Sequence, residues 1–428
     1  MSDPSAELQR RLGAGDVVVI GLGSMLGAGV FAAFAPAAAA AGAGLLVGLV
    51  IAAAVAYCNA TASAQLAAAY PVSGGTYVYG RERLGDWWGF TAGWGFVVGK
   101  TASCAAMAIT FAAYAVPGHP WGQRLVGVLA VVALTALNYR GVTRTAQLTR
   151  ILVTGTLLAL TVVLASLWFG PGSSSAGPSW WTGAGIPGPG GWYGVLQSAG
   201  LLFFAFAGYA RIATMGEEVK DPSRAIPRAI PIALGITVVI YLLIGASALT
   251  VAGPDRLAAS ANPLTTAVDA AGVPAAAVVV TIGGAVASLG ALLALIAGVG
   301  RTTLAMARNR DLPTWLAAVH PRFHVPHHAE IALAVVVSLL ILTMDLRGTI
   351  GFSSFGVLLY YAVANAAAFT QPPEQRRWPR ALNLLGLLGC LTLVATLPVA
   401  SVAVGIVVFA IGLTGRAFII KRRVATGR

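Results

Sequence analysis

Long apolar stretches, separated by short polar connections, run through almost the whole chain. Each stretch is about long enough to cross ~30 Å of hydrocarbon as a helix with a rise of ~1.5 Å per residue. This pattern predicts an all-α polytopic membrane protein with twelve transmembrane helices. They are expected at roughly 16–40, 43–68, 87–115, 123–139, 147–170, 192–215, 231–252, 274–300, 329–345, 349–370, 382–398 and 399–419.

The composition supports the same class. Of 428 residues, 57% are hydrophobic and only 10% are charged, which leaves too little polar surface for a soluble protein of this size. The cysteines lie inside apolar stretches, without the number or spacing of a disulfide framework or a zinc site. We therefore expect them to act as small apolar side chains. They are Cys58, Cys104 and Cys390.

The net charge of +13 is unevenly distributed. With the N-terminus inside, all but five of the 27 lysines and arginines fall on the cytoplasmic side. This asymmetry follows the positive-inside rule and predicts a multi-pass protein of the cell membrane with both termini in the cytoplasm. It explains the basic charge without a nucleic-acid partner. The five exceptions are Lys100, Arg124, Arg211, Arg256 and Arg347.

Small residues interrupt the first and the sixth apolar stretch. The first reads VVVIGLGSMLGAGVFAAF and the sixth reads AGLLFFAFAGYARIATMGEE. Matched interruptions in two five-helix halves indicate an inverted-repeat transporter with a central site. Unwound backbone is tolerated at that depth only where it lines a cavity, and its N–H and C=O groups suit a carboxylate and an ammonium group. The pair therefore predicts a site for a zwitterion, with close helix packing through small residues as the alternative.

Four motifs resemble, in order, those of the amino acid–polyamine–organocation (APC) superfamily of transporters. They are GSMLGAGVF (23–31), YPVSGGTYVY (70–79), FFAFAGYARIATMGEEVKDPSRAIPRAI (203–230) and RTTLAMARNRDLPTWLAAVHPRFHVPHHA (301–329). The resemblance implies the leucine-transporter-like fold of two inverted five-helix repeats, with helices 1 and 6 broken. The divisions would be a tail at 1–15, repeats at 16–170 and 192–370, helices 11 and 12 within 382–419, and a tail at 420–428.

The resemblance also implies a set of site residues. The backbone N–H groups expected to bind a substrate carboxylate are those of Gly27, Ala28 and Gly29. The carbonyls expected to bind its amino group lie near Leu26 and at Phe204 and Ala207, beside Gly208. Aromatic walls or a gate are expected from Phe204 and Phe206, and a side-chain pocket from Thr101 and Cys104. Ordinary packing is the alternative for Phe206, Thr101 and Cys104.

Two positions depart from the family pattern. Many proton-coupled members carry a lysine in the fifth helix, where an ungapped alignment from Gly141 places Thr156; members that exchange substrates also lack it. An acidic residue often follows the glycine of the sixth helix by two positions, where this chain has Ala210. No acidic residue lies in the interior of a predicted helix; Asp16, Asp86, Asp269 and Glu330 flank the predicted helices. A buried cation would lose its hydration with no carboxylate in exchange, so neutral substrates are favoured over cationic ones.

Lys100 is the only charged residue between Trp87 and Gln123. An intramembrane ionisable residue is a functional hypothesis by default. Because desolvation favours the neutral amine, Lys100 could couple transport to protons in place of the missing fifth-helix lysine. The alternatives are a structural role on the carbonyls of a broken helix, and snorkelling. For Arg211 we expect an inner-gate ion pair with Glu217 or Glu218, with snorkelling or substrate contact as alternatives.

These features predict a secondary amino acid transporter that works by alternating access, without a cofactor or a metal. An enzyme is not expected, because the predicted helices hold no histidine, aspartate or glutamate in their interiors. The partners are then the substrate, the lipid bilayer and a coupling ion. Proton coupling through Lys100, exchange, and sodium coupling with ligands near Gly23 and Ser288 remain open, as does a transport-dead amino-acid sensor.

Overall fold

The computed structural model describes residues 12–71, 74–140, 145–174, 188, 190–213 and 219–426. The described residues form helices and short connections, with one isolated bridge between Leu12 and Val219 and no β-strand. Nine helical stretches in this part of the chain are long and apolar enough to cross a membrane. Two shorter apolar helices accompany them, α16 (His327–Thr343) and α18 (Arg380–Thr396). An all-helical polytopic membrane protein is therefore confirmed. The count of twelve spans and the inverted repeat stay predictions.

The principal helices follow the predicted apolar stretches closely. They are α1 (Ala14–Met25), α2 (Ala28–Ala32), α3 (Phe34–Ala41), α4 (Leu45–Ala69), α5 (Thr76–Leu84), α6 (Asp86–Ala115), α7 (Pro120–Tyr139), α8 (Thr145–Phe169), α10 (Gly191–Phe206), α11 (Ala210–Ala213), α12 (Pro222–Ala252), α13 (Pro254–Ala259), α14 (Pro263–Ala270), α15 (Pro274–Arg308), α16 (His327–Thr343), α17 (Leu346–Phe369), α18 (Arg380–Thr396) and α19 (Val399–Thr426).

The largest difference in a boundary is at the start of the seventh stretch. The seventh stretch was expected to begin at 231, but α12 begins at Pro222 and continues through Pro227 and Pro231. A proline suits the first turn of a helix, whereas an interior proline leaves the carbonyl four residues earlier without its usual donor. For Pro227 that carbonyl belongs to Ser223, and the Arg377 guanidinium donates to it at 2.9 Å. A donor from another part of the chain thus supports the longer helix.

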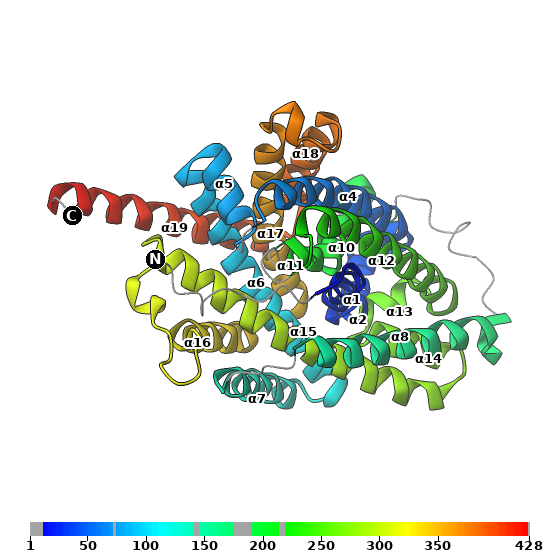
Figure 1. Cartoon of the computed structure of the whole chain (residues 1–428). Helices are drawn as coiled ribbons and strands as arrows, with labels where there is room; N and C mark the ends of the chain where they lie inside the picture. The colour runs from blue at the N-terminus through cyan, green and yellow to red at the C-terminus, as the bar shows by residue number, and fades with distance from the viewer. Residues whose placement is uncertain are drawn as a thin grey trace.

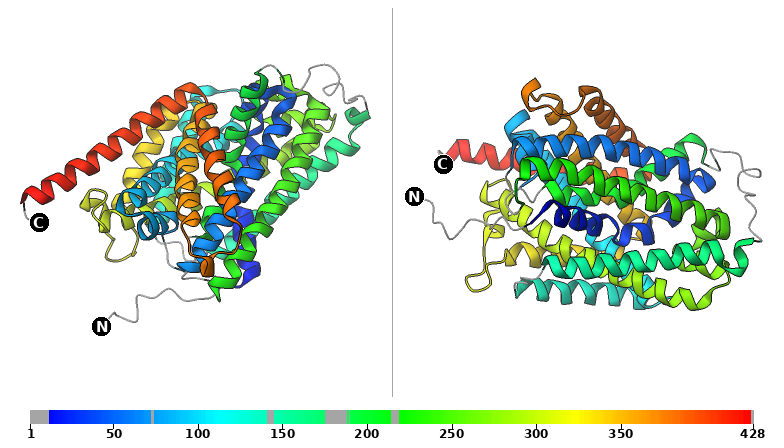
Figure 2. Two further views of the ribbon diagram at one scale, coloured as in Figure 1. Left: turned by 90° about the horizontal axis from the view of Figure 1, so that it is seen from above. Right: turned by 45° about the vertical axis from the view of Figure 1, so that its right-hand side comes forward.

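The interrupted helices lie in the middle of the bundle (Figure 1). The first predicted helix breaks at Leu26 and Gly27, between α1 and α2. The sixth ends its α-helical part at Phe206, makes one 3₁₀ turn over Ala207–Tyr209 and resumes as α11. Both breaks are surrounded by α6, α12 and α15. At the other extreme, α19 extends well away from the bundle and carries the C-terminal end (Figure 2).

Candidate functional site

The two breaks cross each other in direct backbone contact. A Cβ atom added at Gly208 would lie 2.1 Å from the carbonyl oxygen of Ser24, and one added at Gly29 would lie 2.6 Å from the Cα atom of Ala205. No real side chain tolerates such distances, so only glycine permits this approach. The close helix packing that was the alternative explanation is therefore present at the broken segments themselves. The zwitterion site stays a prediction.

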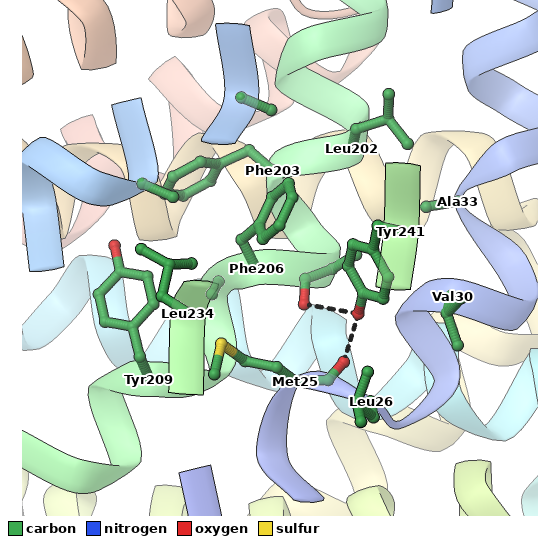
Figure 3. Close-up of a cluster of buried hydrophobic side chains, with 14 of the residues drawn as sticks. Met25, Leu26, Val30, Ala33, Leu202, Phe203, Phe206, Tyr209, Leu234 and Tyr241 are labelled. Atoms are coloured by element: carbon green, nitrogen blue, oxygen red, sulfur yellow. Dashed lines mark hydrogen bonds between the residues drawn. The ribbon is translucent and has the colours of Figure 1, made fainter. Parts of the chain in front are cut away.

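A buried tyrosine joins the two breaks. The hydroxyl of Tyr241 on α12 lies 2.5 Å from the carbonyl oxygen of Met25 and 3.2 Å from that of Ala205 (Figure 3). Both carbonyls belong to the ends of helices, where no backbone N–H follows in helical register to satisfy them. Tyr241 thereby supplies a donor that the unwound backbone lacks, and it ties α1 to α10.

Lys100 reaches the sixth-helix break. Its side chain is buried, with 5% of the residue exposed, and its Nζ atom donates a hydrogen bond of 3.0 Å to the carbonyl oxygen of Ala207. Snorkelling was therefore the wrong alternative, since the amine turns into the bundle rather than toward either end of α6. Ala207 is also a carbonyl that the family resemblance assigned to the substrate amino group.

The structure separates the two aromatic residues that were expected as walls or a gate of the site. Phe204 joins a buried cluster with Ala28, Cys104 and Ala291. Phe206 belongs to the other large cluster, where its ring centre lies 5.1 Å from that of Tyr241 and beside Met25 (Figure 3). Residues two apart on a helix point about 200° from each other, which explains the separation. Phe204 and Cys104 thus belong to the same cluster as Ala28, the first residue of α2.

The remaining predicted positions are buried or partly buried, and they differ in their contacts. The hydroxyls of Thr101, Thr156 and Ser288 each donate to a carbonyl four residues earlier on their own helix, at 2.6–2.8 Å. Gly23 lies within α1. The guanidinium of Arg211 lies against Gly298 of α15, where an added Cβ atom would be 3.4 Å from Nη1. Its expected partners, Glu217 and Glu218, lie outside the described residues.

A buried ionic cluster at the end of α15 was not predicted. Asp311 accepts a hydrogen bond of 2.7 Å from the Tyr77 hydroxyl, and its carboxylate pairs at 3.1 Å with both Arg81 and Arg416. Burial, together with the Asp311 carboxylate, raises the pKa of Tyr77 to about 12, so the phenol keeps its proton and donates. The cluster joins α5, the segment after α15, and α19.

This cluster could have been anticipated only in part. Tyr77, Arg81 and Asp311 lie in or beside two of the four family motifs, in YPVSGGTYVY and in RTTLAMARNRDLP. Neither motif shows by itself that the two loops meet. Arg416 lies more than a hundred residues further along the chain and belongs to no motif.

The burial of Glu330 was not predicted. This residue lies in the first turn of α16, and only 2% of it is exposed. One carboxylate oxygen has no hydrogen-bond partner among the described residues. Its side chain packs against Gly300 of α15.

The chain is similar to known transporters over almost its whole length. A family model described as "Amino acid permease" matches residues 12–420. An uncharacterized transporter from Mycobacterium tuberculosis (strain ATCC 25618 / H37Rv) is 58% identical over 422 residues, covering 99% of this chain and 93% of the relative.

More distant relatives have named substrates. A branched-chain amino acid permease from Bacillus subtilis is 26% identical over 435 residues, covering 95% of this chain and 92% of the relative. Cationic amino acid transporter 7 of Arabidopsis thaliana, a chloroplastic protein, is 28% identical over 389 residues, covering 85% of this chain and 66% of the relative. With a family match that runs almost from end to end, this chain belongs to the amino acid permease family of the APC superfamily, a family of transporters rather than enzymes.

Proposed function

We propose that this permease carries neutral amino acids across the cell membrane by alternating access, coupled to protons through Lys100. The observation that carries the proposal is the hydrogen bond from Lys100 to Ala207, where the two helix breaks cross. In this proposal the chain forms twelve spans, with two inverted repeats at 16–170 and 192–370. Both termini lie in the cytoplasm, as the distribution of arginine and lysine indicates.

The substrate would bind across the two breaks. Its carboxylate would accept hydrogen bonds from the backbone N–H groups of Gly27, Ala28 and Gly29, at the start of α2. Its amino group would bind carbonyls near Leu26 and at Phe204 and Ala207. The side chain would enter the cluster formed by Ala28, Cys104 and Phe204, which are apolar or nearly so.

The names of the relatives support two substrate classes, branched-chain and cationic amino acids. The charge pattern of this chain favours the first class. The carbonyls at the breaks can bind an α-amino group, but a second positive charge on the substrate would need a carboxylate to replace its hydration. The acidic residues of this chain lie outside the interiors of its predicted helices.

Lys100 gives the site its link to protons. Its amine already occupies the Ala207 carbonyl that a substrate amino group would use. A protonated amine binds a carbonyl more strongly than a neutral one, because hydrogen bonds from charged donors are stronger. Protonation of Lys100 would therefore change how firmly the sixth-helix break is held, and with it the balance between the outward and inward states.

The test is uptake of a panel of radiolabelled amino acids into proteoliposomes, with and without an inward proton gradient, for wild type and Lys100→Ala. We expect gradient-driven accumulation of neutral amino acids that the substitution abolishes while substrate binding persists. Uptake that needs only internal amino acid would identify an exchanger. Uptake that needs sodium would favour a sodium site near Gly23 and Ser288. Binding without any flux would identify a sensor and refute the proposed transport.

A further inference from the structure

We propose that a groove on the outer surface of the bundle, between α7 and α16, binds an anionic phospholipid of the cytoplasmic leaflet. The groove has a volume of about 760 Å³. Residues of the second half of α7 form one wall, α16 forms the other, and Arg140 and Phe323 lie at one end. The inference concerns a surface remote from the two helix breaks, so it does not depend on which substrate is carried.

The walls of the groove suit acyl chains. Val132 on α7 and Val335 and Leu339 on α16 line it, and each is more than half exposed, at 52%, 56% and 55%. Both helices are apolar, α7 is long enough to cross a membrane, and α16 is one of the two shorter apolar helices. Side chains exposed on the outer surface of such helices face hydrocarbon rather than water. The occupant of the groove must therefore be apolar over most of its length.

One end of the groove is basic. The exposed Arg140 lines it directly, and the guanidinium of Arg322 lies 5.5 Å from the centre of the Phe323 ring, which also lines it. Neither arginine pairs with an acidic residue in the described part of the chain. The distribution of charge assigns this end of α7 to the cytoplasm. Basic positions at that level of a membrane protein attract anionic head groups.

A buried hydroxyl lies between the basic end and the apolar walls. Thr135 lines the groove, is only 7% exposed, and its hydroxyl has no hydrogen-bond partner among the described residues. Buried threonines of other helices, such as Thr110 on α6 and Thr156 on α8, instead donate to a carbonyl four residues earlier. Thr135 precedes Arg140 by five positions, about 7.5 Å along the helix axis. In a phospholipid, an ester carbonyl lies at a similar depth below the phosphate. With the phosphate at Arg140, that carbonyl would accept a hydrogen bond from the Thr135 hydroxyl.

The combination of these three features identifies the ligand class. Acyl chains explain the walls, but a neutral lipid would leave the two arginines without a role. An apolar helix of a second copy of this chain would fill the walls but would bring no phosphate to Arg140. A phospholipid with a net negative head group satisfies the walls, Thr135 and the arginines together.

The experiment is native mass spectrometry of the purified full chain, titrated with phosphatidylglycerol or with phosphatidylethanolamine of the same acyl chains. The variants are Arg140→Ala combined with Arg322→Ala, then Thr135→Val, and Ala136→Trp to fill the groove. The matched control is Arg224→Ala combined with Arg228→Ala, which removes the same charge from two exposed positions on α12.

We expect wild type and the α12 control to retain phosphatidylglycerol in preference to phosphatidylethanolamine. The double arginine variant should retain roughly tenfold less phosphatidylglycerol, Thr135→Val somewhat less than wild type, and Ala136→Trp neither lipid. The proposal is overturned if both lipids are retained equally. It is also overturned if the double variant behaves like the α12 control, or if Ala136→Trp dissociates a dimer without changing lipid retention. Since Thr135→Val keeps the shape of the side chain, it tests the site even if a larger substitution prevents folding.

Discussion

The Nζ atom of Lys100 on α6 lies 3.0 Å from the carbonyl oxygen of Ala207, in the turn that interrupts the sixth predicted helix. Each group satisfies the hydrogen-bonding requirement of the other. A buried amine needs acceptors because it has lost its hydration, and a carbonyl released from a helix at this depth needs a donor because no water replaces it. The hydrogen bond therefore stabilises the break, and in the proposed mechanism it also relates the break to protonation.

Replacing Lys100 should separate these two roles. Lys100→Gln keeps N–H donors without a titratable group, whereas Lys100→Met keeps an unbranched chain without a donor. We expect the methionine variant to lose about 1–3 kcal/mol of stability, because the Ala207 carbonyl is left unsatisfied. The glutamine variant should retain most of the stability and substrate binding but lose the dependence of uptake on the proton gradient.

Thermal unfolding in detergent measures the first effect, and proteoliposome uptake at several external pH values measures the second. Gradient-driven uptake by Lys100→Gln at the wild-type rate would assign Lys100 a purely structural role.

Removing the hydroxyl of Tyr241 should weaken the junction of the two breaks. Tyr241→Phe leaves the buried carbonyls of Met25 and Ala205 without this donor, at an expected cost of about 1–3 kcal/mol. Uptake should fall with stability, because the relative position of α1 and α10 is no longer fixed. Tyr57, which is 43% exposed on α4, provides the control. If Tyr57→Phe and Tyr241→Phe have the same melting temperature, the bridge contributes nothing.

Adding a methyl group at Gly208 should disrupt the site. The new Cβ atom would lie 2.1 Å from the carbonyl oxygen of Ser24, which is backbone and cannot rotate away. We expect Gly208→Ala to abolish substrate binding and to lower expression of folded protein, since overpacking of this kind commonly costs ~1–3 kcal/mol or more. A scintillation proximity assay with the preferred amino acid measures binding.

Gly235→Ala on α12 is the matched control, since no atom lies within 4 Å of the added Cβ atom. Alanine has the higher helix propensity, by up to about 1 kcal/mol, so this variant should be as stable as wild type or more so. Normal binding by Gly208→Ala would show that the two breaks can move apart without loss of the site.

Breaking the ionic cluster at Asp311 should destabilise the end of the bundle to which α19 is attached. Asp311 and Arg416 are each 6% exposed at the side chain, so removing one partner leaves a buried charge unpaired. The expected cost of Asp311→Asn is about 3–5 kcal/mol. Arg416→Met keeps an apolar chain over Trp87 and Phe90, and it should relieve part of that cost in the double variant.

The exposed pair of Asp221 and Arg224, 3.9 Å apart, supplies the control. Because exposed ion pairs contribute little to stability, Arg224→Ala should leave the melting temperature almost unchanged. Strictly additive effects of Asp311→Asn and Arg416→Met would mean that the two residues do not stabilise each other.

The helices, the two breaks and the importance of Lys100 could be predicted from local patterns in the sequence. Apolar stretches of membrane-spanning length identified the helices, because a bilayer requires every span to satisfy its backbone internally. Gly27, Gly29 and Gly208 marked the two breaks. Lys100 was identified because it is a single charge in a long apolar stretch. The separation of Phe204 from Phe206 also follows from helical periodicity, although the family resemblance had placed them together.

The tertiary structure decided which groups meet. Lys100 and Ala207 are 107 residues apart, and Tyr77 and Asp311 are 234 residues apart. That the Thr135 hydroxyl has no hydrogen-bond partner among the described residues is known only from its surroundings, since most helical threonines donate to their own backbone. Helix formation in a bilayer depends on the length and periodicity of apolar stretches. Both can be read directly from the order of residues. Partners between helices depend instead on how all the spans pack, and that arrangement is determined by the whole chain at once.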